Sequence, residues 1–319
     1  MKLALACGRY DRTQPLIDGR VAVEGVELDY IALRPGETFW RMLNNEEFDA
    51  SEMSLSSYNI LRSKGDERFV AIPVFPSRIF RHSALYLRDD SPVRAPADLK
   101  GRRIGVGDYQ MTAAVWIRGF LQHDFGVKPE DVRWLAGRGV RPIAAPQRVV
   151  LEHTREDMEE LLLRGEIDAL ASVMIPRRLG RGIRRLFPNY REVESEYFRR
   201  TRIFPIMHTL VLRKAVYEAN PWLAVSLYKA FCAARDLSAK WLYDTDALPV
   251  ALPWVIDDVE RSREVAWDYS IEGSRPTLEA LVAYANEQGL TEKRLPIESL
   301  FAPNIRPEME QYLRATGEH

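Results

Sequence analysis

Residues 48–58 read Phe48-Asp49-Ala50-Ser51-Glu52-Met53-Ser54-Leu55-Ser56-Ser57-Tyr58, and residues 72–83 read Ile72-Pro73-Val74-Phe75-Pro76-Ser77-Arg78-Ile79-Phe80-Arg81-His82-Ser83. The first stretch predicts a short apolar strand that ends in one carboxylate and three hydroxyls. The second predicts a strand, stiffened by proline, that carries two guanidinium groups and one imidazole. Together these groups suit a small anionic ligand, and they suit a proton transfer on that ligand.

A second segment echoes the first. Glu166-Ile167-Asp168-Ala169 repeats the pattern of Glu47-Phe48-Asp49-Ala50. In both places a helix is expected to end, an Asp-Ala pair opens a strand, and polar residues follow that strand. The repeat is short, but it indicates two α/β lobes that are built alike.

Strands and helices are expected to alternate along the chain. Strands are predicted over residues 2–6, 26–33, 48–53, 103–106, 131–135, 167–173 and 209–212, with one more that begins near Phe69 and continues through 84–87. Helices are predicted over 37–45, 56–64, 112–123, 156–164, 222–242, 262–267 and 278–288, with a long loop over 137–149. Such alternation predicts mostly parallel sheets, with ligands beyond the carboxyl ends of the strands.

The composition excludes several classes of function. The 319 residues are enough for two lobes, and the 45 basic and 46 acidic side chains nearly cancel, so charge points to neither nucleic acid nor an anionic membrane. Only two cysteines, Cys7 and Cys232, argue against a disulfide framework or a cysteine zinc site. No stretch approaches the roughly 20 apolar residues of a membrane span.

The N-terminus needs separate treatment, because Leu3-Ala4-Leu5-Ala6-Cys7 looks like a lipoprotein cleavage box. A signal peptide needs roughly 7–15 apolar residues after its charged region. Only four residues separate Lys2 from Cys7. The segment is therefore expected to be the first strand of a cytoplasmic protein.

Several segments together resemble one enzyme family. They are Arg9-Tyr10-Asp11-Arg12-Thr13, residues 48–58, Val70–Arg78, Phe80-Arg81-His82-Ser83 and Tyr109-Gln110-Met111-Thr112-Ala113. In these segments the chain resembles the 4,5-dihydroxyphthalate decarboxylases, which are related to solute-binding proteins of the type II periplasmic fold. The resemblance covers most of residues 1–213 and is weaker in the C-terminal part.

The resemblance implies a two-lobed α/β fold with a ligand cleft between the lobes. Residues 1–90 and 205–319 would form lobe one, and residues 91–204 would form lobe two. Two crossings, near Leu87 and near His208, would form the hinge. The implied reaction is a non-oxidative decarboxylation of a hydroxylated aromatic carboxylate, in which the carboxyl-bearing ring carbon takes up a proton.

Three residues are the catalytic candidates. His82 is the first choice for the proton donor, since histidine can give or take a proton near neutral pH; its structural alternative is a hinge histidine bonded to backbone. His208 stands at the return crossing and can face the same cleft. Glu52 follows a buried strand, where a carboxylate needs a partner or a function. It can accept a phenolic proton, position a histidine, or form a salt bridge with Arg78 or Arg81.

The substrate-binding candidates are guanidinium, hydroxyl and amide groups near predicted strand ends or helix starts: Arg9, Arg12, Ser54, Ser56, Arg78, Arg81, Tyr109, Gln110 and Thr112. Arginine can hold a carboxylate in a bidentate arrangement. For Ser54, Ser56 and Thr112 the competing interpretation is helix capping, which is compatible with anion binding at a helix N-terminus.

No organic cofactor is expected, because the decarboxylation needs none and no motif for one occurs. A metal site of His82, His208 and Glu52 stays open, without support from spacing. The alternative function is a non-catalytic binding protein for a small aromatic or other organic anion. A homo-oligomer is also open, since Trp222, Trp241, Trp254 and Trp267 suit either an interface or a core.

Overall fold

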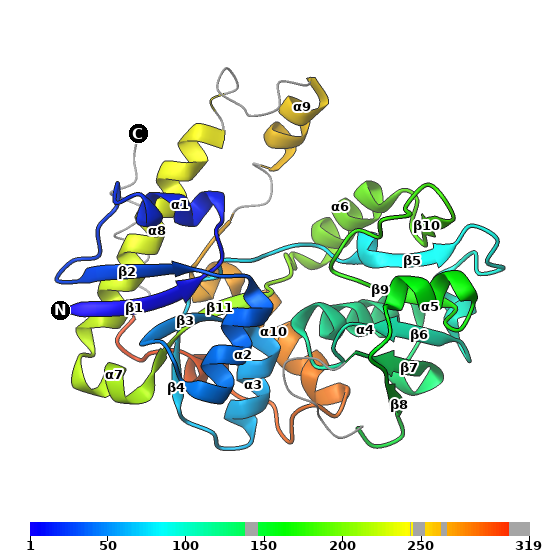
Figure 1. Cartoon of the computed structure of the whole chain (residues 1–319), viewed down its shortest axis with the longest axis horizontal. Helices are drawn as coiled ribbons and strands as arrows, with labels where there is room; N and C mark the ends of the chain where they lie inside the picture. The colour runs from blue at the N-terminus through cyan, green and yellow to red at the C-terminus, as the bar shows by residue number, and fades with distance from the viewer. Residues whose placement is uncertain (138–145, 243, 245–252, 263–266, 306–319) are drawn as a thin grey trace.

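The strands form two separate mixed sheets, seen side by side in Figure 1. This computed structural model describes residues 1–137, 146–242, 244, 253–262 and 267–305. The first sheet has the order β2 (Glu27–Ala32), β1 (Lys2–Cys7), β3 (Ala50–Ser54), β11 (His208–Arg213) and β4 (Phe69–Ile72). The second has the order β10 (Ile183–Arg185), β5 (Leu85–Arg88), β9 (Ala169–Ala171), β6 (Arg103–Val106), β7 (Arg133–Ala136) and β8 (Val150–His153).

The two sheets are built on one plan, as the repeated Asp-Ala pattern predicts. In each, parallel strands are followed by one antiparallel strand that comes from the other half of the chain: β11 beside β3, and β5 beside β9. Asp49 accepts a hydrogen bond from the backbone N–H of Ala4 at 3.0 Å. Asp168 accepts one from that of Arg103 at 2.9 Å. Each aspartate thus ties the entry of one strand to its parallel neighbour.

The helices pack around these sheets and between them. They are α1 (Gln14–Ile17), α2 (Pro35–Asn45), α3 (Leu55–Ser63), α4 (Thr112–Phe125), α5 (Met158–Arg164), α6 (Tyr190–Thr201), α7 (Lys214–Ala219), α8 (Trp222–Leu242), α9 (Pro253–Ser262) and α10 (Ile271–Glu287). Helix α2 packs on β3, and α10 packs on both α3 and α4, so it joins the two halves. None of the helices in the described ranges is long and apolar enough to cross a membrane.

Two crossing segments connect the halves. The prediction of one strand from Phe69 through 84–87 is wrong, since β4 and β5 lie in different sheets. Proline is confined within sheets to edges and bulges, and Pro73 and Pro76 follow β4 directly. The chain between the strands instead pairs with residues 205–207, through Ile79 N–H to Pro205 O (3.0 Å) and Met207 N–H to Ser77 O (2.8 Å). Because β5 already belongs to the second sheet, the first crossing precedes residue 85.

The remaining expectations fare unevenly. Helix α8 has the predicted bounds, 222–242. The helical pattern at 262–267 is mostly outside the described residues, as are residues 138–145 of the predicted loop. Strands β8 and β10 and helix α6 were not predicted. Of the four tryptophans, Trp267 donates to Phe75 O at 3.0 Å, whereas Trp222 and Trp241 are 42% and 37% exposed. The side chain of Trp254 lies outside the described residues.

Candidate active site

Glu52 is a fully buried carboxylate with four polar neighbours. It lies on β3, and Oε1 accepts a hydrogen bond from the Tyr10 hydroxyl at 2.7 Å and lies 2.6 Å from His208 Nδ1. Oε2 accepts the backbone N–H of Gly8 at 2.8 Å and lies 3.5 Å from the Cys7 thiol. Of the alternatives left open for Glu52, the contact with a histidine is the one that the structure contains, and no salt bridge with Arg78 or Arg81 occurs among the described residues.

These neighbours keep Glu52 ionised. Burial by itself raises the pKa of a carboxyl, because it penalises the charged form. Here the attraction of His208 and the hydrogen bonds from His208, Tyr10 and Gly8 together outweigh burial, and the pKa of Glu52 lies below its ordinary value. The surroundings of Glu52 therefore favour its charged form, beside the imidazole of His208.

His208 is the first residue of β11, and it pairs with Ser54 at the end of β3. Its Nδ1 faces Glu52, and the edge of its ring meets Phe39 at 4.9 Å between centroids. With Nδ1–H donated to a carboxylate, Nε2 is the nitrogen that exchanges a proton. Nε2 has no hydrogen-bond partner among the described residues, and the side chain remains 17% exposed. His208 therefore has one nitrogen fixed and one available.

Tyr10 was not singled out from the sequence, although it orients Glu52. It follows β1 in the loop that carries Arg9 and Arg12, and its position at a strand end was the signal that could have found it. Gly8 makes room for the tyrosine, since a Cβ at Gly8 would stand 2.6 Å from the Tyr10 ring. Burial and the nearby Glu52 raise the pKa of Tyr10, so its hydroxyl stays protonated as a donor.

Four of the predicted binding residues meet where the two halves touch. Thr112 Oγ1, at the start of α4, lies 2.9 Å from Ser54 Oγ and 3.1 Å from Ser56 Oγ, and it accepts the Ser56 N–H at 3.1 Å. Ser56 Oγ donates to the Gln110 carbonyl at 2.6 Å. Ser54 also accepts the Ser57 N–H at 3.4 Å, as the predicted cap of α3. These hydroxyls bond mainly to one another and join α3 to α4.

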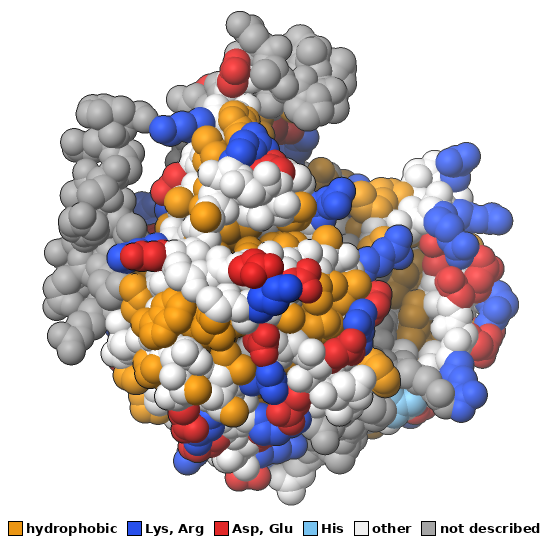
Figure 2. Space-filling model, turned by 60° about the vertical axis from the view of Figure 1, so that its left-hand side comes forward, with side chains coloured by type: hydrophobic (Ala, Val, Ile, Leu, Met, Phe, Trp, Pro, Cys, Tyr) orange, Lys and Arg blue, Asp and Glu red, His pale blue; other side chains and the backbone are white. Residues whose placement is uncertain are grey.

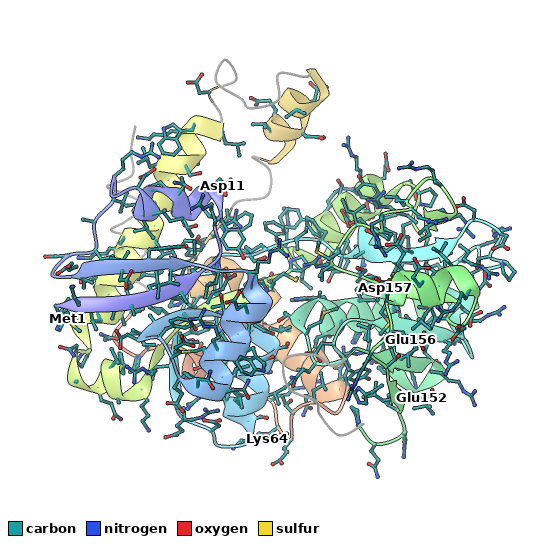
Figure 3. All side chains as sticks on the ribbon, viewed as in Figure 1. Met1, Asp11, Lys64, Glu152, Glu156 and Asp157 are labelled. Atoms are coloured by element: carbon teal, nitrogen blue, oxygen red, sulfur yellow. The ribbon has the colours of Figure 1, made fainter. Side chains whose placement is uncertain are left out.

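The two arginines after β1 differ. Arg12 donates to Pro76 O at 2.6 Å, pairs with Asp11 at 2.7 Å, and lies over the rings of Tyr10 (4.4 Å) and Trp267 (4.0 Å). Figure 3 labels Asp11 beside α1, above the first sheet. Arg9 is exposed. One arginine is therefore held over Tyr10, and the other points to solvent.

Arg78 and Arg81 also differ. Arg78 is buried and donates to two carbonyls, Asp268 O at 2.7 Å and Phe204 O at 3.1 Å. It fastens the crossing segment to the C-terminal part of the chain. Arg81 donates from Nε to the Met207 sulfur at 3.4 Å and has no ion pair within the described part of the chain. The two guanidiniums are therefore not equivalent as ligand-binding groups.

His82 lies in an aromatic cluster rather than beside Glu52. Its ring stacks on Phe120 at 4.1 Å and meets Phe187 and Tyr197 edge-on at 5.7 and 5.1 Å. Only 2% of the residue is exposed, and Nδ1 has no partner among the described atoms. Burial, with a smaller effect of Arg200, lowers the pKa of His82 to about 4. These surroundings favour packing, and the donor role of His82 stays a prediction.

Tyr109 is likewise a core residue. It is 1% exposed, meets Trp134 edge-on at 5.7 Å, and has the guanidinium of Arg118 3.8 Å above its ring.

The metal site that the sequence left open, made of His82, His208 and Glu52, is not assembled. Within the described ranges no three His, Cys, Asp or Glu side chains gather as a metal site, and His82 stands apart from the pair of Glu52 and His208.

Curated relatives carry a single name. The chain is 37% identical over 319 residues to a 4,5-dihydroxyphthalate decarboxylase of Comamonas testosteroni, covering 95% of this chain and 97% of the relative. It is 32% identical over 262 residues to a 4,5-dihydroxyphthalate decarboxylase of Pseudomonas putida, covering 79% and 93%. No protein-family model matches the chain.

Solved structures bear on the fold alone. The periplasmic aliphatic sulphonate binding protein SsuA of Escherichia coli matches with a TM-score of 0.55 and 16% identity, covering 95% of this chain and 98% of that one. The alkanesulfonate-binding protein SsuA of Xanthomonas axonopodis pv. citri matches with a TM-score of 0.54 and 15% identity, covering 95% and 96%. The predicted two-lobed α/β fold of the periplasmic-binding-protein type is confirmed. By its curated relatives, the chain belongs to the 4,5-dihydroxyphthalate decarboxylase family.

Proposed function

We propose that this protein removes one carboxyl group of 4,5-dihydroxyphthalate as CO2, with His208 as the proton donor to the ring carbon. The pair of Glu52 and His208 carries the proposal, since it leaves Nε2 available above a buried anion. The names of the curated relatives supply the substrate.

The chemistry balances with these groups. Each carboxyl group of this substrate has a hydroxyl para to it. Loss of the phenolic proton and protonation of the carboxyl-bearing carbon by Nε2 give a ketone tautomer. The bond to the carboxylate then breaks, CO2 leaves, and the electron pair restores the aromatic ring. One proton is consumed overall, and His208 recovers its proton from the phenol or from solvent.

Glu52 serves this step by fixing the imidazole with Nδ1 toward the protein, which leaves Nε2 for the transfer. General acid catalysis of this kind contributes typically about 10²–10⁴ in rate. A catalytic role of His82 is less well supported, because its ring is enclosed by aromatic side chains.

We place the substrate between the lobes, beyond the carboxyl ends of β1 and β3. The sheet of β1 and β3 would form one wall, and the sheet of β5 and β9 the other. Figure 2 shows a surface hollowed between the halves, with acidic and basic side chains interleaved on the face in view.

We also infer a cytoplasmic location, since Leu3 and Leu5–Cys7 of the lipoprotein-like box are buried in β1. Self-association through Trp222 and Trp241 stays a prediction.

The test is a turnover assay with 4,5-dihydroxyphthalate and no added metal, which follows CO2 and 3,4-dihydroxybenzoate. His208→Gln is expected to lower kcat by about 10²–10⁴ and to leave substrate binding nearly unchanged. The control is His123→Gln, at an exposed ring that bonds to Glu287, and it should keep full activity. Saturable binding without CO2 in the wild-type protein would instead support the non-catalytic binding protein.

A further inference from the structure

Arg81 is a partly buried cation without a counter-ion. Apart from the Met207 sulfur, its N–H groups have no hydrogen-bond partner in the described ranges. Burial lowers the pKa of Arg81 to about 10, only partly offset by Tyr86 and Glu194. The other N–H groups of Arg81 are not among the buried atoms without a partner, so they stay open to water and to an anionic ligand.

Arg78 provides the internal comparison. Burial lowers its pKa to about 10 as well, and it lies three residues earlier on the same crossing segment. Two carbonyls accept its Nη groups, and its guanidinium lies over Phe204 at 4.8 Å. The folded chain therefore supplies partners for both Nη groups of Arg78, whose buried Nε has none among the described residues, and leaves the Nη groups of Arg81 open.

The charges around Arg81 favour an anion. Glu194 accepts the Ser83 N–H at 3.0 Å and forms no ion pair with Arg81 within the described residues. Burial raises the pKa of Glu194. Arg185 donates to Ser83 O at 3.1 Å and lies over the Tyr190 ring at 4.8 Å. Two guanidinium groups, those of Arg81 and Arg185, therefore lie close enough to act on one carboxylate, which already accepts a backbone N–H.

The position of Arg81 links it to the proposed proton donor. Its contact residue, Met207, directly precedes His208, and residues 77–79 pair with residues 205–207 across the two crossings. The crossing segment that carries Arg81 therefore runs beside the start of β11, where His208 lies. Figure 3 shows the side chains around these crossings, between the two sheets.

We propose that Arg81 binds the carboxylate that the substrate keeps, which makes the site selective for aromatic acids with two adjacent carboxyl groups. This inference rests on the proposed function. The leaving carboxylate becomes neutral CO2, so a strong cation on it would stabilise the ground state more than the transition state and slow the reaction. A fixed guanidinium is better placed on the retained group, where its attraction is constant through the reaction and orients the ring.

The test is binding of phthalate, a diacid without hydroxyls that is not turned over, measured by calorimetry. Arg81→Met is expected to raise the Kd for phthalate about 10- to 100-fold, as loss of a charged hydrogen bond predicts. Its Kd for catechol, which has no carboxylate, should stay within about twofold. Arg78→Met is the matched control. It should lower Tm, because the carbonyls of Asp268 and Phe204 lose the hydrogen bonds that Arg78 donates. Arg81→Met should keep Tm, since Arg81 has no hydrogen bond in the described ranges beyond that to the Met207 sulfur.

Wild-type affinity for phthalate in Arg81→Met would overturn the inference, and so would a fall in Tm like that of Arg78→Met, which would make Arg81 structural. The proposed function fails in a different way. In that case the wild-type protein binds phthalate through Arg81 but releases no CO2 from 4,5-dihydroxyphthalate. The two failures are therefore separable.

Discussion

Glu52 Oε1 lies 2.6 Å from His208 Nδ1, and the two partners differ sharply in exposure. The carboxylate is fully buried, whereas the imidazole side chain is 17% exposed. The buried carboxylate of Glu52 therefore contacts an imidazole that is partly accessible to solvent. Strand pairing fixes this relationship, because Glu52 and His208 lie on the adjacent strands β3 and β11.

Glu52→Gln should impair both catalysis and folding. The glutamine amide has one accepting oxygen and one NH2 group in place of the two carboxylate oxygens, so either Gly8 N–H or Tyr10 and His208 meet the NH2 group. Loss of one partner of a buried pair predicts a decrease of about 2–4 kcal/mol in the free energy of unfolding near pH 7, with a lower kcat. Urea unfolding and the turnover assay measure the two effects.

The pH dependence of this difference has a defined sign. The pKa of Glu52 in the folded chain is below its ordinary value of 4.5, so the stabilisation is present above that value and is lost as pH falls below it. Wild type and Glu52→Gln should therefore converge in stability at low pH. A gap that stays constant down to about pH 3 would show that the charge of Glu52 contributes nothing.

Tyr10→Phe tests whether the tyrosine positions Glu52. The hydrogen bond from Tyr10 lowers the pKa of Glu52, so its removal should raise that pKa and move the acidic limb of kcat/KM to higher pH. We also expect kcat to fall about tenfold near neutral pH. Tyr30→Phe is the control, since its hydroxyl donates to Gly8 O at 2.7 Å instead. If both variants kept the wild-type acidic limb, Tyr10 would have no role through Glu52.

Local patterns predicted the fold better than the site. Asp49 and Asp168 each precede a strand and accept a hydrogen bond from the backbone of the neighbouring parallel strand. A four-residue pattern was therefore enough to predict two lobes built alike. Glu52 was expected to need a partner, and its strand was correctly placed. The choice among partners depended on strand order, which places β11 between β3 and β4, and no local pattern encodes that order.

The surroundings of the other candidate residues depend on distant contacts as well. Arg78 and Arg81 lie three residues apart and are alike in sequence, yet the return crossing supplies a carbonyl partner, Phe204 O, to only one of them. His82 was preferred to His208 because it follows Arg81. Its aromatic neighbours, Phe120 and Tyr197, come from helices 38 and 115 residues further along the chain. Contacts at such separations cannot be read from spacing.

His82→Phe should keep activity and improve stability in mild acid. The pKa of His82 is about 4 in the folded chain against an ordinary 6.5, so the unfolded chain binds the proton first. Wild-type stability should therefore fall as pH drops from 6.5 toward 4, by up to roughly 3 kcal/mol, and the phenylalanine removes this loss. Urea unfolding at several pH values measures it, with His153→Phe, at an exposed ring, as the control. A large loss of kcat with a native fold would restore His82 as the proton donor.

Thr112→Val should weaken the contact between the halves rather than substrate binding. Valine has nearly the same shape, but it leaves the buried Ser56 N–H without its acceptor and removes the link to Ser54 Oγ. An unsatisfied buried group costs about 1–3 kcal/mol, so the free energy of unfolding should fall by that amount while KM changes less than about twofold. Thr154→Val is the control, since Thr154 bonds only within the second half, to Glu156 N–H at 3.1 Å. Unchanged stability with a much higher KM would assign the hydroxyls of Ser54, Ser56 and Thr112 to the substrate, as the sequence predicted.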